Sequence, residues 1–169
     1  MSLWTPDNIM DVPPYPPDRF DGEPEHSASL RFATEPEDYS VGPMKFDYLV
    51  TETKSDGDYG LYRVELGPRA GGAAAHYHRA ISEAFYVLDG TMRLFDGDKW
   101  VEATTGDFLY VPPGGVHGFR NDADEPAQVL VLFSPGAPRE SYFEGLSHLS
   151  KLTDDERREW NFRHDSYFL

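Results

Sequence analysis

Short runs of β-forming residues, separated by turn residues, recur along most of this chain. In residues 61–66 the apolar side chains occupy alternate positions, as they do in a strand with one buried face. Clusters of Gly, Pro, Asp and Ser separate the runs. Strands this short, at this spacing, predict an all-β antiparallel sandwich or barrel. The other runs are 30–33, 46–53, 75–78, 84–88, 91–95, 99–103, 107–111, 117–121 and 128–133.

The two ends of the chain have a different character. Residues 1–26 are rich in Pro, Asp and Glu, and proline neither donates a backbone hydrogen bond nor fits a central strand, so we predict an arm that is either disordered or laid over the domain. Residues 27–136 form the predicted β-barrel. Residues 137–169 are predicted to be short helices packed on the barrel, because apolar residues have helical spacing and Thr153 with Glu156 forms a capping box. The apolar residues that favour a laid-over arm are Trp4, Ile9, Val12, Tyr15 and Phe20.

The composition excludes several classes of partner and chemistry. The formal net charge is −15, so phosphate backbones and anionic membrane surfaces are repelled. The chain contains no cysteine, which excludes disulfides and thiolate chemistry. The first residues lack the basic and apolar regions of a secretory signal, and no apolar run is long enough to span a bilayer. We therefore expect a soluble, cytoplasmic protein of one domain, with no nucleic-acid and no membrane partner.

Three of the six histidines lie close to one glutamate in the predicted strands. His76 and His78 are two residues apart, which places both side chains on one face of a strand. Glu83 begins the next strand, and His117 follows a Pro-Pro-Gly-Gly turn. Three imidazoles and one carboxylate suit Fe, Ni, Mn, Co, Cu or Zn, so we predict one divalent transition metal ion per chain with open positions for a substrate or O₂. The alternative is that these three are ordinary buried or surface histidines. The other histidines are predicted to be surface residues: His26, His148 and His164.

The same alternation predicts the walls of a pocket. Counting from Glu83 places Phe85 and Val87 on the ligand face, and counting from His117 places Phe119 there. Aromatic walls suit a flat or apolar organic substrate. For each of these side chains the alternative is packing in the barrel core, because side chains fill small barrels. Further candidates are Tyr62, Met92 and Phe133.

Two stretches around the ligands resemble the motifs of the cupin superfamily. HYHRAISEAFYVLDG (76–90) is similar to the first motif, with His-x-His, four residues, Glu, six residues and Gly. GDFLYVPPGGVHGFRN (106–121) is similar to the second, with Gly, five residues, Pro-x-Gly, two residues, His, three residues and Asn. One departure is Ala70, where the family often has glycine. The resemblance implies a double-stranded β-helix, or jelly roll, and four metal ligands: His76, His78, Glu83 and His117.

The inter-motif spacing and the aromatic-rich segment after the barrel resemble small bacterial cupins of the quercetinase type. This resemblance implies a metal-dependent dioxygenase that acts on a small phenolic or flavonol-like substrate. Glu83 would be both a ligand and the catalytic proton acceptor. It also implies a homodimer. The alternatives are a metal-dependent cyclase or isomerase of polyketide-like substrates and a non-catalytic small-molecule-binding cupin, because one fold hosts many chemistries.

Overall fold

The computed structural model describes residues 14–169, which belong to two units, one ending at Leu30 and the other running from Arg31 to Leu169. In the first unit, residues 14–30 form no helix or strand, and their side chains are exposed. Tyr15 and Phe20 are 86% and 57% exposed. The other apolar residues of the predicted arm lie outside the described residues: Trp4, Ile9 and Val12.

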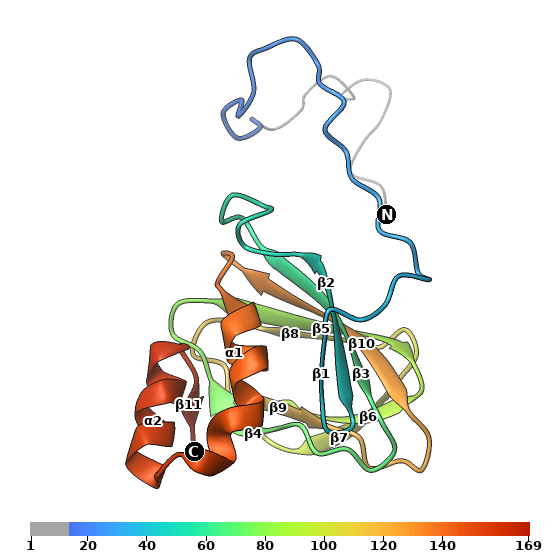
Figure 1. The fold of residues 1–169 in the computed structure, drawn as a ribbon, viewed down its shortest axis with the longest axis vertical. Coiled ribbons are helices and arrows are strands. Elements are labelled where there is room, and N and C mark those ends of the chain that lie inside the picture. The colour runs from blue at the N-terminus through green and yellow to red at the C-terminus, as the bar shows by residue number, and fades with distance from the viewer. Residues whose placement is uncertain (1–13) are drawn as a thin grey trace. The chain divides into compact units, whose positions relative to one another are not determined.

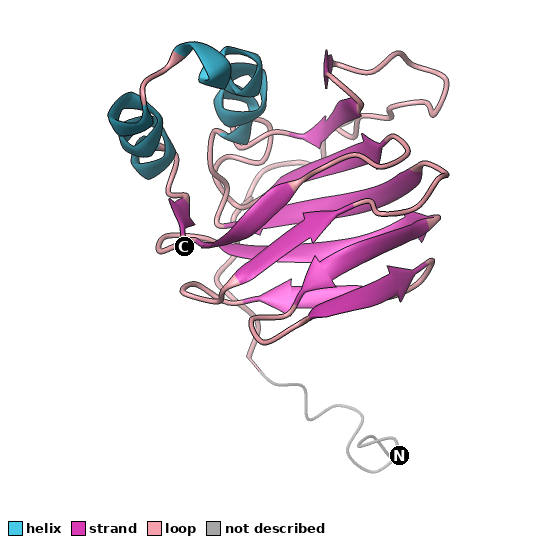
Figure 2. Cartoon of the chain, turned by 90° about the horizontal axis from the view of Figure 1, so that it is seen from below, coloured by secondary structure: helices cyan, strands magenta, loops and turns pink. Residues whose placement is uncertain are grey.

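The second unit contains two antiparallel sheets that face each other (Figures 1 and 2). The six-stranded sheet has the order β1 (Tyr39–Val41), β2 (Met44–Val50), β3 (Gly60–Leu66), β10 (Ala127–Ser134), β5 (Ser82–Asp89) and β8 (Phe108–Val111). The five-stranded sheet has the order β11 (Tyr167–Phe168), β4 (Ala73–Tyr77), β9 (His117–Arg120), β6 (Thr91–Phe95) and β7 (Trp100–Thr104). Strands far apart in sequence are neighbours in both sheets, as in a jelly roll. The all-β prediction is confirmed, although the two sheets do not close into a continuous barrel.

The core fills the space between the sheets, and alternation along the strands supplies it. In β3 and β10 every second side chain is buried, which confirms the pattern expected of residues 61–66. Each large apolar side chain removed from water stabilises the fold by about 1.5–3 kcal/mol. The largest fully buried side chains include Tyr62, Phe85, Phe133, Leu66, Met92 and Leu94.

One predicted strand is wrong. Residues 30–33 form no strand, and the first strand begins only at Tyr39. Leu30 and Phe32 are 76% and 62% exposed, so this apolar run has no sheet to cover. The Glu35 carboxylate accepts a hydrogen bond from the Phe32 N–H at 2.6 Å, which closes a local turn instead.

Two residues fix connections at the ends of strands, Gly90 through its backbone conformation and Asn121 through side-chain hydrogen bonds. Gly90, between β5 and β6, has φ of +78°, and a Cβ there would lie 2.6 Å from the Pro126 carbonyl oxygen, so only glycine fits. The Asn121 side chain bonds three carbonyls and the N–H of Ala123. Its amide therefore joins the chain after β9 to the end of β3 and the start of β10.

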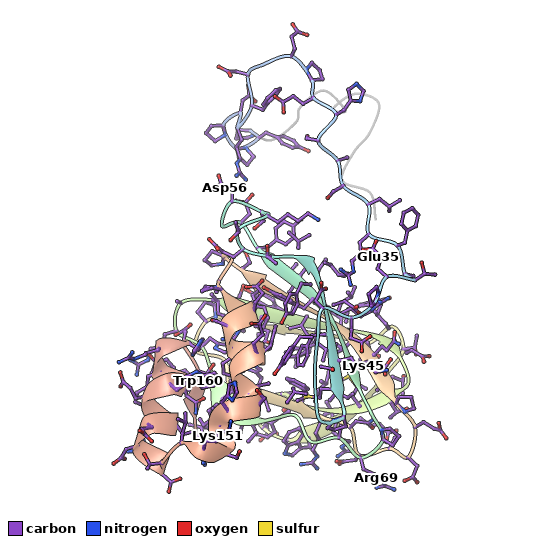
Figure 3. All side chains as sticks on the ribbon, viewed as in Figure 1. Glu35, Lys45, Asp56, Arg69, Lys151 and Trp160 are labelled. Atoms are coloured by element: carbon purple, nitrogen blue, oxygen red, sulfur yellow. The ribbon has the colours of Figure 1, made fainter. Side chains whose placement is uncertain are left out.

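The C-terminal segment forms α1 (Arg139–Gly145), the 3₁₀ helix η1 (Leu146–Lys151) and α2 (Asp154–Arg163), which Figure 1 shows in orange and red. The capping box is confirmed, since Thr153 Oγ1 accepts from the Glu156 N–H and the Glu156 carboxylate accepts from the Thr153 N–H. The predicted helix over 139–149 changes to 3₁₀ after Gly145, where a Cβ would lie 2.5 Å from the ring of Trp160 on α2 (Figure 3). Within residues 14–169, no helix is long and apolar enough to cross a membrane.

The chain then turns through Asp165, which has φ of +53°, into β11. This two-residue strand pairs with β4 and has no counterpart in the predicted elements. His148 is exposed as predicted, and so is His26. His164, also predicted to lie on the surface, is half-buried at the end of α2, with its ring 4.4 Å from the Trp160 ring.

Candidate metal centre

Three strands bring the four predicted ligands into one buried cluster. His76 lies on β4 and His78 just beyond it, while Glu83 and His117 stand near the starts of β5 and β9. All four side chains are at most 4% exposed. One donor atom from each lies within 4.8 Å of the others, a spacing that could hold a single metal ion.

Each imidazole is oriented by a backbone carbonyl. The Nδ1 atoms lie 2.8 Å from the Ala74 oxygen for His76, 2.5 Å from the Asp165 oxygen for His78 and 3.0 Å from the Gly115 oxygen for His117. A carbonyl only accepts, so each Nδ1 carries a proton and turns Nε2, the ligand atom, toward the cluster. The Nε2 atoms of His78 and His117 lie 3.1 and 2.7 Å from Glu83 Oε2. The donor set therefore converges on one point.

Burial and mutual contacts control the charges of the cluster. Burial lowers the pKa of His76 to about 4, and His117 contributes to this lowering, so the His76 imidazole is neutral at pH 7. Burial alone would raise the pKa of Glu83, but hydrogen bonds from His117 and His78 outweigh it and hold the pKa well below its ordinary range. Burial alone would lower the pKa of His117, but the hydrogen bond to Glu83 and its charge outweigh burial and raise it. A metal ion binds neutral imidazoles and an ionised carboxylate, so a bound ion would displace the proton on His117 Nε2. The residues present therefore fit a divalent transition metal.

The C-terminal segment supports the cluster in a way that the sequence did not indicate. The Asp165 carbonyl holds His78, and the Asp165 carboxylate accepts from the backbone N–H groups of Arg79 (3.0 and 3.1 Å to its two oxygens) and Ala80 (2.8 Å), in the loop between β4 and β5. The ring of Phe168, on β11, stacks on His76 at a centroid distance of 4.9 Å. In the sequence, the one signal for this contact is the acidic Asp165 just after the end of α2. That signal does not predict which residues Asp165 contacts.

A cavity of about 390 Å³ opens beside His76 and Glu83. Two of the predicted pocket residues, Phe119 and Phe133, line it. The other lining residues come from both sheets and from the C-terminal helices: Met44, Phe46, Val64, Gly72, Ala73, Val131, Arg139, Tyr142, Phe143, Leu146, Leu149, Arg157, Asn161 and Phe168. The walls are therefore mainly apolar and aromatic.

Four other predicted pocket residues do not line this cavity: Tyr62, Phe85, Val87 and Met92. All four are fully buried in the packed interior. Alternation predicted correctly that these side chains point inward. It could not predict which inward positions are filled by core packing and which border the cavity. Tyr62 illustrates the difference, since its hydroxyl donates to the Glu140 carboxylate at 2.6 Å and its ring packs edge-on against Phe133.

Comparisons with known proteins agree with this geometry. Residues 62–133 match the Cupin domain family. The chain is 30% identical over 92 residues to quercetin 2,3-dioxygenase of Bacillus subtilis (strain 168), across 54% of this chain and 27% of that protein. It is 32% identical over 108 residues to polyketide synthase CurC of Streptomyces cyaneus, across 63% of this chain and 67% of that protein. The fold resembles an RmlC-like cupin from Shewanella frigidimarina NCIMB 400, with a TM-score of 0.56, 23% identity and coverage of 69% of this chain and 96% of that one.

The matched region has two properties that matter for function. It contains all four candidate ligands, whereas α1, η1, α2 and β11 lie beyond its end at residue 133. The alignment with the dioxygenase spans only 27% of that protein. The part that matches the family model therefore contains the candidate ligands, and the helices that form part of the cavity wall lie outside it.

Proposed function

The chain belongs to the cupin superfamily, and from that premise we propose that it is a metal-dependent dioxygenase acting on a small phenolic or flavonol-like compound. The observation that carries the proposal is the position of the ligand cluster in the wall of the cavity. His76 and Glu83 line it together with aromatic side chains such as Phe119 and Phe133. Its volume of about 390 Å³ falls within the range of small-molecule sites.

The chain's own residues divide the work. The histidines, held through Nδ1 by backbone carbonyls, present Nε2 atoms in fixed directions. A divalent ion in this set supplies Lewis acidity, which lowers the pKa of a bound hydroxyl. Glu83, whose carboxylate belongs to the same cluster, would accept the released proton. The apolar walls exclude water from the reacting compound.

The test combines metal analysis with oxygen consumption. The protein is purified without added metal, analysed for its elements, reconstituted with each candidate divalent ion and screened for O₂ uptake on a panel of phenols and flavonols. We expect about one ion per chain, as one four-ligand cluster implies. We also expect O₂ uptake that matches product formation and disappears in His117→Ala. Metal-loaded protein that forms product at the same rate without O₂ would refute the dioxygenase.

The similarity to polyketide synthase CurC favours a second candidate, a metal-dependent cyclase or isomerase of polyketide-like compounds. It would use the same ligands and cavity but consume no O₂. Anaerobic turnover on polyketide-like substrates would favour it. Saturable binding with no turnover under either atmosphere would favour a non-catalytic binding protein instead.

A further inference from the structure

We propose that Arg139 binds a carboxylate of the cavity's ligand, so that this ligand is a small aromatic acid. The proposal rests on the proposed function only in placing the substrate in this cavity. It concerns a residue of the C-terminal segment, beyond the part of the chain that matches the cupin family. The evidence is the burial of Arg139, its missing partners and the charge of the metal site beside it.

Arg139 is the first residue of α1, and its side chain lines the same cavity as His76 and Glu83. Three rings surround the guanidinium, and the ring centroid of Phe143 is the most distant, at 5.9 Å. The central carbon of the guanidinium lies 4.2 Å from the ring centroid of Tyr142 and 4.9 Å from that of Phe133. The ring of Phe133 is in turn 6.3 Å from that of His78. The cation therefore stands one aromatic side chain away from the metal cluster.

This buried guanidinium is largely unpaired. Arg139 is 5% exposed, and the one hydrogen bond of its side chain to the described residues runs from Nη1 to the His164 carbonyl at 2.8 Å. Its Nε is buried without a hydrogen-bond partner. Within residues 14–169, no carboxylate forms an ion pair with it. Burial lowers the pKa of Arg139, but a guanidinium stays protonated in proteins, and a buried charge of this kind is unfavourable without an anion.

The neighbouring cluster does not supply that anion. The Glu83 carboxylate already receives hydrogen bonds from His78 and His117 and is a candidate metal ligand. A divalent ion held by three neutral imidazoles and one carboxylate keeps a net positive charge. Two cationic groups would then face the same apolar cavity. A ligand that brings a carboxylate to Arg139 would satisfy the planar guanidinium fork, which matches carboxylate geometry.

Arg157 provides an internal contrast. It also lines the cavity, but its side chain is 42% exposed and lies 3.5 Å from the Asp154 carboxylate. It also donates to the carbonyls of Leu149 and Leu152, at 3.3 Å each. Both of its terminal nitrogens are therefore paired, and water screens its charge. A carboxylate has less to gain from Arg157 than from Arg139.

The experiment compares acids with neutral analogues of the same shape. The probes are benzoate, 4-hydroxycinnamate and 2-naphthoate, each paired with its amide, and their binding to the Zn²⁺-loaded full-length chain is measured by calorimetry. We expect at least one acid to bind about 10–100-fold more tightly than its amide, as expected for charge-assisted hydrogen bonds. Arg139→Met should abolish this preference, and Arg139→Lys should keep only part of it. The matched control, Arg157→Met, should keep it in full.

Three results would overturn the proposal: amides that bind as tightly as acids throughout the panel, no binding of any acid, or an acid preference that persists in Arg139→Met. If it persists there but disappears when Zn²⁺ is removed, the carboxylate binds the metal and not Arg139. The acid–amide comparison uses the wild-type chain, so it is informative even if a variant fails to fold. Acid preference without O₂ uptake would refute only the dioxygenase, and O₂ uptake without acid preference would refute only the role of Arg139.

Discussion

Replacing Asp165 with alanine should weaken metal binding, although Asp165 is not a ligand. The substitution removes the carboxylate that accepts from the N–H groups of Arg79 and Ala80. It also places alanine at a backbone φ of +53°, a left-handed conformation that aspartate tolerates better. The backbone carbonyl that holds His78 Nδ1 remains in the chain, but it loses the contacts that fix its position.

The size of the effect follows from these contacts. A hydrogen bond to a charged group contributes about 1.5–3 kcal/mol. Because Asp165 is only half-buried, we take the lower figure, which gives about 3 kcal/mol for its two N–H donors. The left-handed backbone adds roughly 1 kcal/mol. We therefore expect the free energy of unfolding to fall by about 4 kcal/mol, and the metal affinity by about 10–100-fold, the usual cost of losing a partner that orients a ligand.

The assay is Zn²⁺ affinity by competition with a chelator, paired with thermal unfolding of the metal-free protein. Asp165→Asn keeps one acceptor oxygen and tolerates the left-handed backbone, so it should lose less affinity than Asp165→Ala. Asp124→Ala is the control, because that carboxylate forms an ion pair with Arg69 but its side chain is 80% exposed. A Zn²⁺ affinity of folded Asp165→Ala within twofold of wild type would refute the reasoning.

Three other perturbations test the site and the arm. Alanine at His76, His78 or His117 should reduce metal content far below one ion per chain, whereas the exposed His148→Ala should retain it; equal retention in both groups would mean that the ligands are other residues. Glu83→Gln cannot accept a proton, so turnover should fall by about 10²–10⁴-fold at equal metal loading, and activity that merely follows bound metal would leave Glu83 as a ligand alone. Deletion of residues 1–26 should leave metal content unchanged, and metal loss in a folded truncation would place the arm in the site.

The sequence predicted the ligand cluster well because the physical rules involved are local. His76 and His78 share a strand face by alternation, and a turn rich in glycine and proline precedes the strand that begins at His117. The resemblance to the cupin motifs specified the same four residues. The structure brings their donor atoms within 4.8 Å of one another.

The missed elements depend on contacts that no local pattern contains. Leu30 and Phe32 look like part of a strand, but whether they form one depends on a partner strand that the fold does not provide. The reverse holds for β11, which is too short for any periodicity and exists because it pairs with β4, far earlier in the chain. Whether a segment forms a strand depends on the partner strand with which it pairs. A local sequence pattern describes the segment alone and contains no information about that partner.

The same limit applies to the cavity. Alternation gave the correct face for Phe85 and Phe119, but Phe85 is packed into the core, whereas Phe119 lines the open space. The difference is set by where the helices of the C-terminal segment cover the sheets. Their contribution to the wall includes Tyr142 and Phe143, which the strand pattern could not place.

Two successive backbone carbonyls after α2, those of His164 and Asp165, contact Arg139 and His78. The His164 carbonyl accepts from Arg139 Nη1, and the next carbonyl, that of Asp165, lies against His78 Nδ1. One stretch of backbone therefore positions both the cation in the cavity wall and a metal ligand. The C-terminal segment therefore orients a residue of the candidate metal centre and also forms part of the cavity wall.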